Sequence, residues 1–253
     1  MRRLTGRVFI CGAGPGDPHL LTLKAAKLLK TCDVVLYDRL VTNKIIELIP
    51  DRCKKIYIGR ETGDSTCHQD KTNNLMVEHA KKGEKVLRLK GGDPFIFGRG
   101  GEEAEYLREH NIKFEIVPGI TSPIASAIYA GIPITHRRFS SSIAIVTGHE
   151  SAEKGERVVK WDKLASAVDT VIIMMGIGRL RQISTDLIKA GMNKNIDAAI
   201  IENATTAGQR VVKGTVGTIV DISNEARIKP PAIIIIGKVV SLHEKLSWLH
   251  SIP

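Results

Sequence analysis

Residues 7–18, RVFICGAGPGDP, contain the strongest signals for the fold. The apolar run Arg7–Cys11 predicts a buried strand, and the glycines that follow it predict a tight turn. Asp17 and Pro18 predict the start of a helix, because Asp is a common N-cap and Pro fits the first helical position. A strand, a glycine-rich turn and a helix in this order are typical of α/β proteins.

Apolar runs and amphipathic stretches continue to alternate along the chain, which favours parallel strands joined by helices. A Pro-Gly turn at Pro118-Gly119 interrupts this pattern. We therefore expect two α/β domains, residues 1–119 and 120–253. The predicted strands are 34–37, 85–89, 114–117, 143–147, 170–175, 198–201 and 232–236, and the predicted helices are 122–130, 179–190 and 239–250.

The chain carries a surplus of positive charge. Its 253 residues include 37 Lys and Arg against 27 Asp and Glu, a net charge of +10. Residues 1–120 hold 21 basic and 16 acidic residues and residues 121–253 hold 16 and 11, so each half contributes +5. The charge forms no basic tail, and aromatic residues make up 4% of the chain. The surplus charge could serve a nucleic acid, an anionic membrane surface or a heavily acidic small molecule. A nucleic-acid-binding protein, the rival of a different class, would need a basic stripe with interleaved aromatics, and the sequence shows neither.

Other patterns exclude several compartments and chemistries. The longest apolar runs are strand-sized, so we expect no membrane span and no membrane partner. The short apolar stretch near the N-terminus does not fit a signal peptide. The cysteines at 11, 32, 53 and 67 form no C-x-x-C pair and no metal spacing. We therefore expect no metal and a location in the reducing cytoplasm.

The turn at residues 12–17 partly matches the dinucleotide-binding pattern G-x-G-x-x-G. Asp17 stands at the third glycine position, where its charge would face a pyrophosphate. Pro15 lacks the backbone N–H that a phosphate site would use. Asp38, after the second predicted strand, imitates the ribose-binding acid of such proteins. A nicotinamide oxidoreductase is therefore less well supported than a tight strand–helix turn.

Two further segments combine glycine with charged residues. Residues 90–103 contain five glycines, which let a backbone approach a ligand, and have Asp93, Arg99 and Glu102 as polar candidates. The alternative is a surface loop followed by a helix with Glu102 and Glu103 in its first turn. Residues 136–138, His-Arg-Arg, suit carboxylate or phosphate recognition, or form a solvated charged turn.

Taken together, these segments resemble the tetrapyrrole methylase family in order and spacing from Val8 to about Val240. The resemblance implies two α/β domains of a type distinct from the Rossmann fold, usually in a homodimer. S-adenosyl-L-methionine would lie in the cleft between the domains, with S-adenosyl-L-homocysteine as product. The motifs that carry the resemblance are residues 12–18 with 20–22, then 37–41, 91–103, 117–122 and 131–137.

The resemblance implies a reaction in which methyl groups pass from the sulfonium of S-adenosyl-L-methionine to C2 and C7 of uroporphyrinogen III, giving precorrin-2. A methyl sulfonium is already activated, so no metal is required, and the protein must align the reactants and exclude water. Other members of the family, which methylate precorrin-2 or precorrin-4 or act as diphthine synthase, are the alternatives. The implied cofactor-binding residues are Pro15, Gly91, Gly92, Asp93, Ile96, Thr121, Ser122, Met175, Ala204 and Ala232.

The resemblance also implies roles for charged residues. Asp38 matches the family's proton acceptor. Arg60 stands where the family usually has a lysine as proton donor. Because arginine does not readily release its proton, we expect Arg60 to anchor substrate or stabilise charge. Arg99 is a further catalytic candidate, and Glu102 and Arg137 are substrate-binding candidates.

Overall fold

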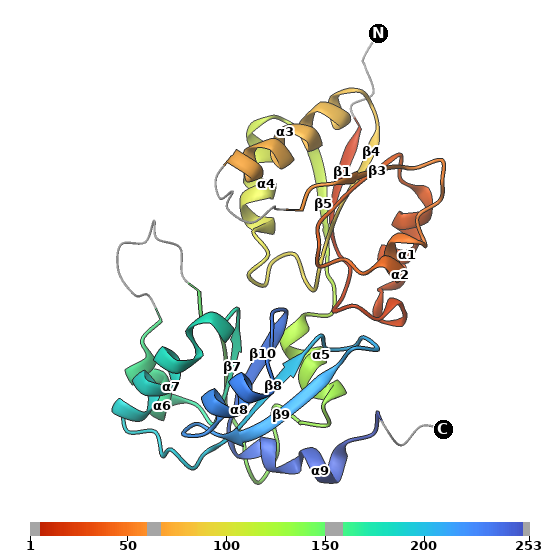
Figure 1. Ribbon diagram of the computed structural model, residues 1–253. Helices are drawn as coiled ribbons and strands as arrows, with labels where there is room; N and C mark the ends of the chain where they lie inside the picture. The colour runs from red at the N-terminus through yellow and green to blue at the C-terminus, as the bar shows by residue number, and fades with distance from the viewer. Residues whose placement is uncertain (1–5, 60–66, 150–158, 250–253) are drawn as a thin grey trace. The chain divides into compact units, whose positions relative to one another are not determined.

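The computed structural model describes residues 6–59, 67–149 and 159–249. The chain forms two compact units, Met1–Ser122 and Pro123–Pro253. This division falls three residues after Gly119, the end of the first predicted domain. Each unit is built on its own five-stranded sheet (Figure 1).

The first unit contains a sheet with the strand order β3-β2-β4-β1-β5. Its neighbouring strands all run parallel, as the apolar runs predict. The carboxyl ends of these strands therefore meet at one edge of the sheet. The elements are β1 (Arg7–Gly12), the 3-10 helix η1 (Pro18–Leu20), α1 (Leu23–Thr31), β2 (Val34–Tyr37), α2 (Asn43–Ile46), β3 (Lys54–Tyr57), α3 (Cys67–Lys81), β4 (Lys85–Lys90), α4 (Gly100–Glu109) and β5 (Lys113–Val117).

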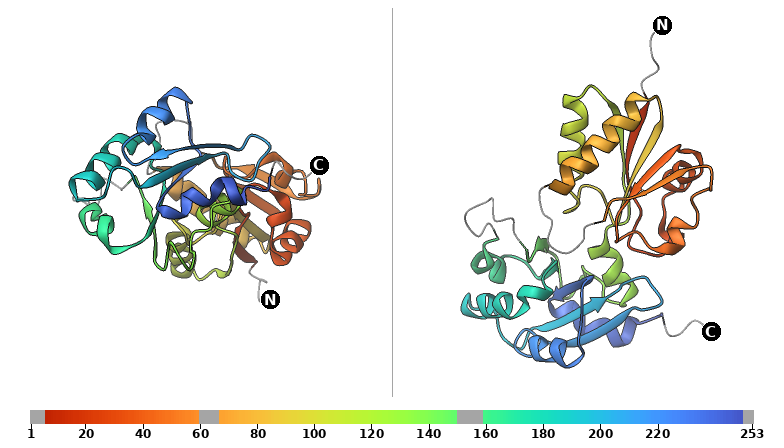
Figure 2. Two further views of the ribbon diagram at one scale, coloured as in Figure 1. Left: turned by 90° about the horizontal axis from the view of Figure 1, so that it is seen from below. Right: turned by 45° about the horizontal axis from the view of Figure 1, so that its top comes forward.

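Helices cover both faces of this first sheet, as the views in Figures 1 and 2 show. Successive side chains of a strand point to opposite faces. Phe9 of β1 therefore packs in one core with Leu28 of α1. Its neighbour Ile10 packs in the other core with Met76 of α3 and Leu107 of α4. Burial on both faces explains why these strands are continuous apolar runs.

The turn after β1 begins a helix as predicted. Asp17 is the N-cap of η1, where its carboxylate accepts the backbone amide of His19 at 2.9 Å and Pro18 is the first helical residue. The helix is interrupted after this one turn. α1 has its own N-cap, Thr22, whose Oγ1 accepts the amide of Ala25 at 3.1 Å.

The second unit contains a mixed sheet with the strand order β6-β7-β10-β8-β9. Among its described strands only β6 and β7 pair in parallel, and the other pairs are antiparallel. The expectation of parallel strands is wrong for this unit, because a short buried apolar run looks the same in either direction. The elements are α5 (Ser122–Tyr129), β6 (Ile143–Thr147), α6 (Trp161–Ala167), β7 (Thr170–Met174), the 3-10 helix η3 (Ile177–Arg179), α7 (Leu180–Lys189), β8 (Asp197–Glu202), β9 (Arg210–Thr215), α8 (Ile219–Glu225), β10 (Ala232–Ile236), the 3-10 helix η4 (Lys238–Leu242) and α9 (His243–Leu246).

The second sheet is also covered on both faces. Ile173 of β7 packs in one core with Leu187 of α7 and Ile219 of α8. Ile172 of the same strand packs in the opposite core with Ala127 of α5. The helices predicted at 122–130 and 179–190 are confirmed as α5 and α7. The helix predicted at 239–250 is wrong in form, because η4 and the short α9 take its place over the described residues.

Three glycines let the loops at the carboxyl edge of the first sheet touch one another. A Cβ atom on Gly12 would lie 2.5 Å from the carbonyl oxygen of Gly92 and 2.6 Å from the Cα of Gly119. These obstacles are backbone atoms, which cannot rotate away as the end of a long side chain can. The segments after β1, β4 and β5 therefore approach this closely because Gly12 and Gly119 lack side chains, and Gly92 contributes the carbonyl oxygen that both would meet.

We predict that Gly12→Ala lowers the free energy of unfolding by about 1–3 kcal/mol, because the added methyl group forces these segments apart. Gly101→Ala is the matched control. Gly101 lies in α4 with no atom within 4 Å of the added Cβ, so this change should raise the free energy of unfolding by about 0.5–1 kcal/mol. Urea unfolding measures both. A Gly12→Ala protein as stable as the wild type would contradict the backbone contact.

Candidate active site

The carboxyl edge of the first sheet gathers the predicted site residues of this unit. Pro15 follows β1, Asp38 follows β2, and the glycine-rich segment follows β4. Thr121 and Ser122 follow β5 after the Pro-Gly turn. Ligands of open α/β sheets bind outside the carboxyl ends of the strands, and the first unit presents its candidates at that edge. The residues placed there are Pro15, Asp38, Gly91, Gly92, Asp93, Ile96, Arg99, Thr121 and Ser122.

The glycine-rich segment is held against the first loop by its backbone. Gly92 donates to the carbonyl oxygen of Gly14 at 2.7 Å, and Ala13 donates to that of Lys90 at 2.7 Å. Gly92 has a φ of +69°, which glycine adopts without strain. A Cβ on Gly92 would lie 3.5 Å from the backbone nitrogen of Ser122, in the space between the two segments. A side chain here would fill that space, so glycine keeps it open.

Asp93 ties the two segments together. Its Oδ1 accepts the amide of Phe95 at 2.8 Å and its Oδ2 accepts the amide of Gly119 at 3.0 Å. Each carboxylate oxygen can accept more than one hydrogen bond, so Asp93 keeps capacity for a hydroxyl or ammonium group of a ligand. Asp93 is half-buried, so a ligand at the carboxyl edge of the sheet can reach its carboxylate.

The loop after Asp93 holds an unusual backbone. Phe97 has a φ of 52° and Arg99 a φ of 59°, conformations that cost a non-glycine residue about 1–3 kcal/mol each. Phe95, Ile96 and Phe97 are exposed. Strain and exposed apolar side chains together are typical of a binding loop. Arg99 Nε donates to Glu102 Oε1 at 3.2 Å, so the catalytic candidate and the substrate-binding candidate form an exposed ion pair.

A buried ionic cluster lies behind this edge, formed by Arg88 and Lys90 of β4, Glu103 of α4 and Asp38. Glu103 has 0% of its side chain exposed, and its Oε1 accepts from Arg88 Nε at 3.0 Å and Lys90 Nζ at 2.9 Å. Gln69 Nε2 donates to the same oxygen at 3.2 Å. Arg88 also donates from both of its terminal nitrogens to Asp38 Oδ2, at 3.3 Å each. The cluster joins a predicted catalytic residue to the interior of the first unit.

The cluster shifts the titration of its members. Burial alone raises the pKa of Glu103, but the charges of Arg88 and Lys90 outweigh it and hold that pKa below the ordinary value of 4.5. Burial lowers the pKa of Lys90 below its ordinary 10.5, and the nearby charge of Arg88 adds to this effect. Glu103 is therefore ionised at neutral pH inside the protein.

The sequence did not predict this cluster. The alternative that places Glu102 and Glu103 in the first turn of a helix is confirmed, but the two side chains differ, because Glu103 is fully buried and Glu102 is exposed. One signal was present. Arg88 interrupts the apolar run of a central strand, and a charged side chain there must find a partner. The sequence did not show which carboxylate that partner would be.

The second unit brings three further cofactor candidates to one edge of its sheet. Ala232 pairs with Glu202 at the end of β8, and its neighbour Ile233 pairs with Met174 at the end of β7. Met175 follows the end of β7 directly, and Ala204 is the second residue after the end of β8. Met175 has a φ of 53°, and positive φ values also occur at Asn203 and Thr205 on either side of Ala204. The strained turns mark this edge of the second sheet as a candidate site.

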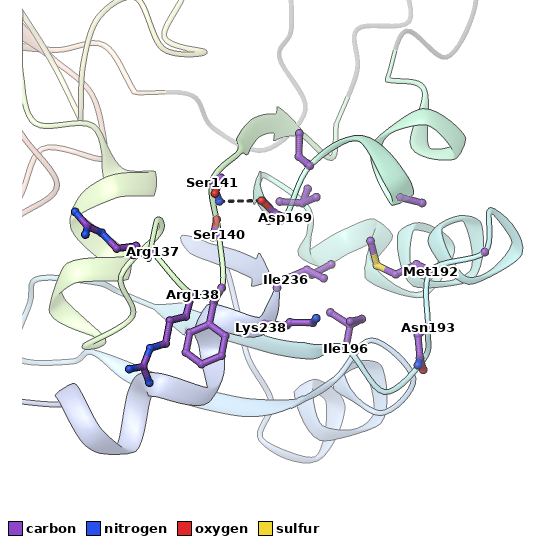
Figure 3. A pocket seen from close by; sticks show the side chains of 16 residues that line it. Arg137, Arg138, Ser140, Ser141, Asp169, Met192, Asn193, Ile196, Ile236 and Lys238 are labelled. Carbon is purple, nitrogen blue, oxygen red and sulfur yellow. Dashed lines mark hydrogen bonds between the residues drawn. The ribbon is translucent and has the colours of Figure 1, made fainter.

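Arg137 lies at the opposite edge of the second sheet. The turn that carries it leads to Ser140, whose Oγ lies 2.8 Å from that of Thr170 at the start of β7. A cavity of about 410 Å³ opens here, and Figure 3 shows the guanidinium of Arg137 pointing away from Asp169 and Lys238. Within the second unit, the structure does not bring Arg137 together with Met175, Ala204 and Ala232. We do not assign this cavity to the cofactor.

The remaining predictions concern Arg60, metal binding and membrane spans. Arg60 lies outside the described residues. Across 6–59, 67–149 and 159–249, no group of three His, Cys, Asp or Glu side chains could hold a metal ion. Over the same ranges, no helix is long and apolar enough to span a bilayer.

The chain belongs to the tetrapyrrole (corrin/porphyrin) methylases, whose family model matches residues 7–220. It is 51% identical to the uroporphyrinogen-III C-methyltransferase of Priestia megaterium, over 93% of this chain and 99% of that protein. It is 39% identical to the Thermus thermophilus uroporphyrin-III C-methyltransferase solved with S-adenosyl homocysteine. That structure matches with a TM-score of 0.80, over 94% of this chain and 100% of the other.

Some relatives are longer. The chain is 48% identical to the porphyrin biosynthesis protein HemD of Ruminiclostridium josui, over 98% of this chain and 49% of that protein. The chain thus spans about half the length of some curated relatives and nearly all of others.

We predict that Glu103→Gln lowers the free energy of unfolding by about 3–5 kcal/mol at pH 7, because two buried cations lose their counter-charge. The folded-state pKa of Glu103 is below its ordinary 4.5, so its stabilisation is complete above that pH and is lost as the pH falls through the folded-state pKa. The difference between variant and wild type should therefore shrink below pH 4.5. Urea unfolding as a function of pH measures it.

Glu102→Gln is the matched control for this prediction. It neutralises the neighbouring carboxylate, whose exposed ion pair with Arg99 contributes at most about 1 kcal/mol. If Glu103→Gln were no more destabilising than Glu102→Gln at pH 7, the ionic account of the cluster would be wrong.

Proposed function

We propose that this chain transfers two methyl groups from S-adenosyl-L-methionine to C2 and C7 of uroporphyrinogen III, giving precorrin-2. The observation that carries the proposal is the carboxyl edge of the first sheet, where the glycine-rich segment after β4 lies next to Asp38, which follows the neighbouring strand β2. The relatives of matching length support it, since they are named for this reaction.

The residues of the first unit fit the cofactor. The space that a Cβ on Gly92 would fill adjoins Ser122, and Asp93 has acceptor capacity beside it. We propose that the cofactor is held by Pro15, Gly91, Gly92, Asp93, Ile96, Thr121 and Ser122 in the first unit and by Met175, Ala204 and Ala232 in the second. When bound, S-adenosyl-L-methionine supplies an activated methyl group.

The protein's own task is to position the reacting carbon, exclude water and manage protons. Asp38 is the proposed proton acceptor, because its carboxylate lies at the carboxyl edge and is held by Arg88 on its inner side. Arg99, with Glu102 beside it, lies on the strained loop and is suited to the substrate's carboxylates. Arg60 is proposed to add positive charge for the same polyanion. Arg137 is not assigned to it, because it lies at the opposite edge of the second sheet from Met175, Ala204 and Ala232. A homodimer and a cytoplasmic location stay predictions.

Incubation with S-adenosyl-L-methionine and uroporphyrinogen III under anaerobic conditions tests the activity, with mass spectrometry of the products. We expect addition of two methyl groups. Absence of transfer to uroporphyrinogen III, with transfer to precorrin-2 or precorrin-4 instead, would assign the chain to another branch of the family.

We predict that Asp93→Ala lowers the affinity for S-adenosyl-L-homocysteine at least about tenfold, because both the ligand acceptor and the tie between two loops are lost. Calorimetry measures the affinity. Asp51→Ala, an exposed aspartate of the same unit, is the matched control and should bind as the wild type does. Equal affinities for all three proteins would remove Asp93 from the proposed site.

A further inference from the structure

The two carboxylate oxygens of Asp38 accept hydrogen bonds from two different residues. Its Oδ1 accepts the amide of Leu40 at 3.0 Å, and its Oδ2 accepts both terminal nitrogens of Arg88 at 3.3 Å. Its side chain is 24% exposed. One side of the carboxylate therefore remains accessible at the edge, while the other side is fixed from within.

The guanidinium of Arg88 is itself held at three points. It donates to Asp38, to the carbonyl oxygen of Leu89 at 3.0 Å and, through Nε, to Glu103 at 3.0 Å. Its side chain is only 7% exposed, so a large polyanionic substrate cannot reach it. Arg88 therefore acts on the carboxylate of Asp38 and not on substrate.

Glu103 and Lys90 complete the charge balance behind Arg88. Two carboxylates and two cations make the cluster neutral as a whole. The second oxygen of Glu103, Oε2, is buried without a hydrogen-bond partner among the described residues. Replacing such a buried ionic group with apolar residues is often neutral or stabilising, so stability alone does not account for the cluster. A positioning role accounts for the cluster, because Glu103 holds the guanidinium of Arg88 and Arg88 holds the carboxylate of Asp38.

We infer that Arg88 is a positioning residue, which orients the carboxylate of Asp38 for proton transfer and is itself anchored by Glu103. This inference rests on the proposed function of Asp38. It predicts that a change at Arg88 matters only while Asp38 is present.

A double-mutant cycle between Arg88→Lys and Asp38→Asn tests the inference. Arg88→Lys keeps the charge but cannot reach both carboxylates with a planar fork. We expect it to lower kcat about 10–100-fold, as misplacement of a catalytic group does, with little change in the KM for uroporphyrinogen III. In the Asp38→Asn background the same change should cost less than about twofold, because the group that it positions is gone. Arg108→Lys, at an exposed arginine of α4, is the control and should leave kcat unchanged.

The outcomes separate the possible failures. Losses that multiply across the cycle, or a loss carried by the KM for uroporphyrinogen III, would overturn the positioning role. If Arg88→Lys does not fold, the pair Arg88→Gln with Glu103→Gln, which removes one buried cation and one buried carboxylate together, is carried through the same cycle. A wild-type chain that methylates no uroporphyrinogen III would refute the proposed function, and the inference would fall with it. Activity with a multiplicative cycle would refute the inference alone.

Discussion

The contact between backbone atoms of Gly12, Gly92 and Gly119 is the constraint on which the first unit's candidate site depends. It brings together the segments after β1, β4 and β5, which are distant in sequence. Because no side chain separates them, the space beside Gly92 lies within reach of Ser122 and Asp93. A glycine-rich segment here serves close approach, both of loops to one another and of a ligand to the backbone.

This edge contains an exposed ion pair and a buried ionic cluster, and the two differ in their access to solvent. The exposed pair joins Arg99, at the end of the strained loop, to Glu102 in the first turn of α4. Solvent weakens their mutual attraction, and a carboxylate-rich ligand can compete for the arginine. Behind them, the buried side chains of Arg88, Lys90 and Glu103 form ion pairs, and Arg88 holds the partly exposed Asp38 by direct hydrogen bonds. An adaptable outer pair and a rigid inner one suit an enzyme that must bind a large anion and place one carboxylate accurately.

Local pattern predicted most of the strands, because parallel strands buried on both faces leave continuous apolar runs. It missed β3 and β9, which are edge strands with exposed or half-buried side chains and no such run. It also misjudged strand direction in the second unit, where pairing is decided by contacts between distant segments. The glycine motifs identified the loops of the candidate site. The Arg88–Glu103 pair was missed because a buried charge is recognised only through a partner that the fold supplies.

The central claim is that the carboxyl edge of the first sheet, and not the cavity between Arg137 and Lys238, holds the cofactor. Hydrogen–deuterium exchange with and without S-adenosyl-L-homocysteine tests it most directly. We predict slower exchange on binding in peptides covering residues 12–17, 90–99 and 117–122. Unchanged exchange in these peptides, with protection confined to residues 137–141 and 190–193, would contradict it.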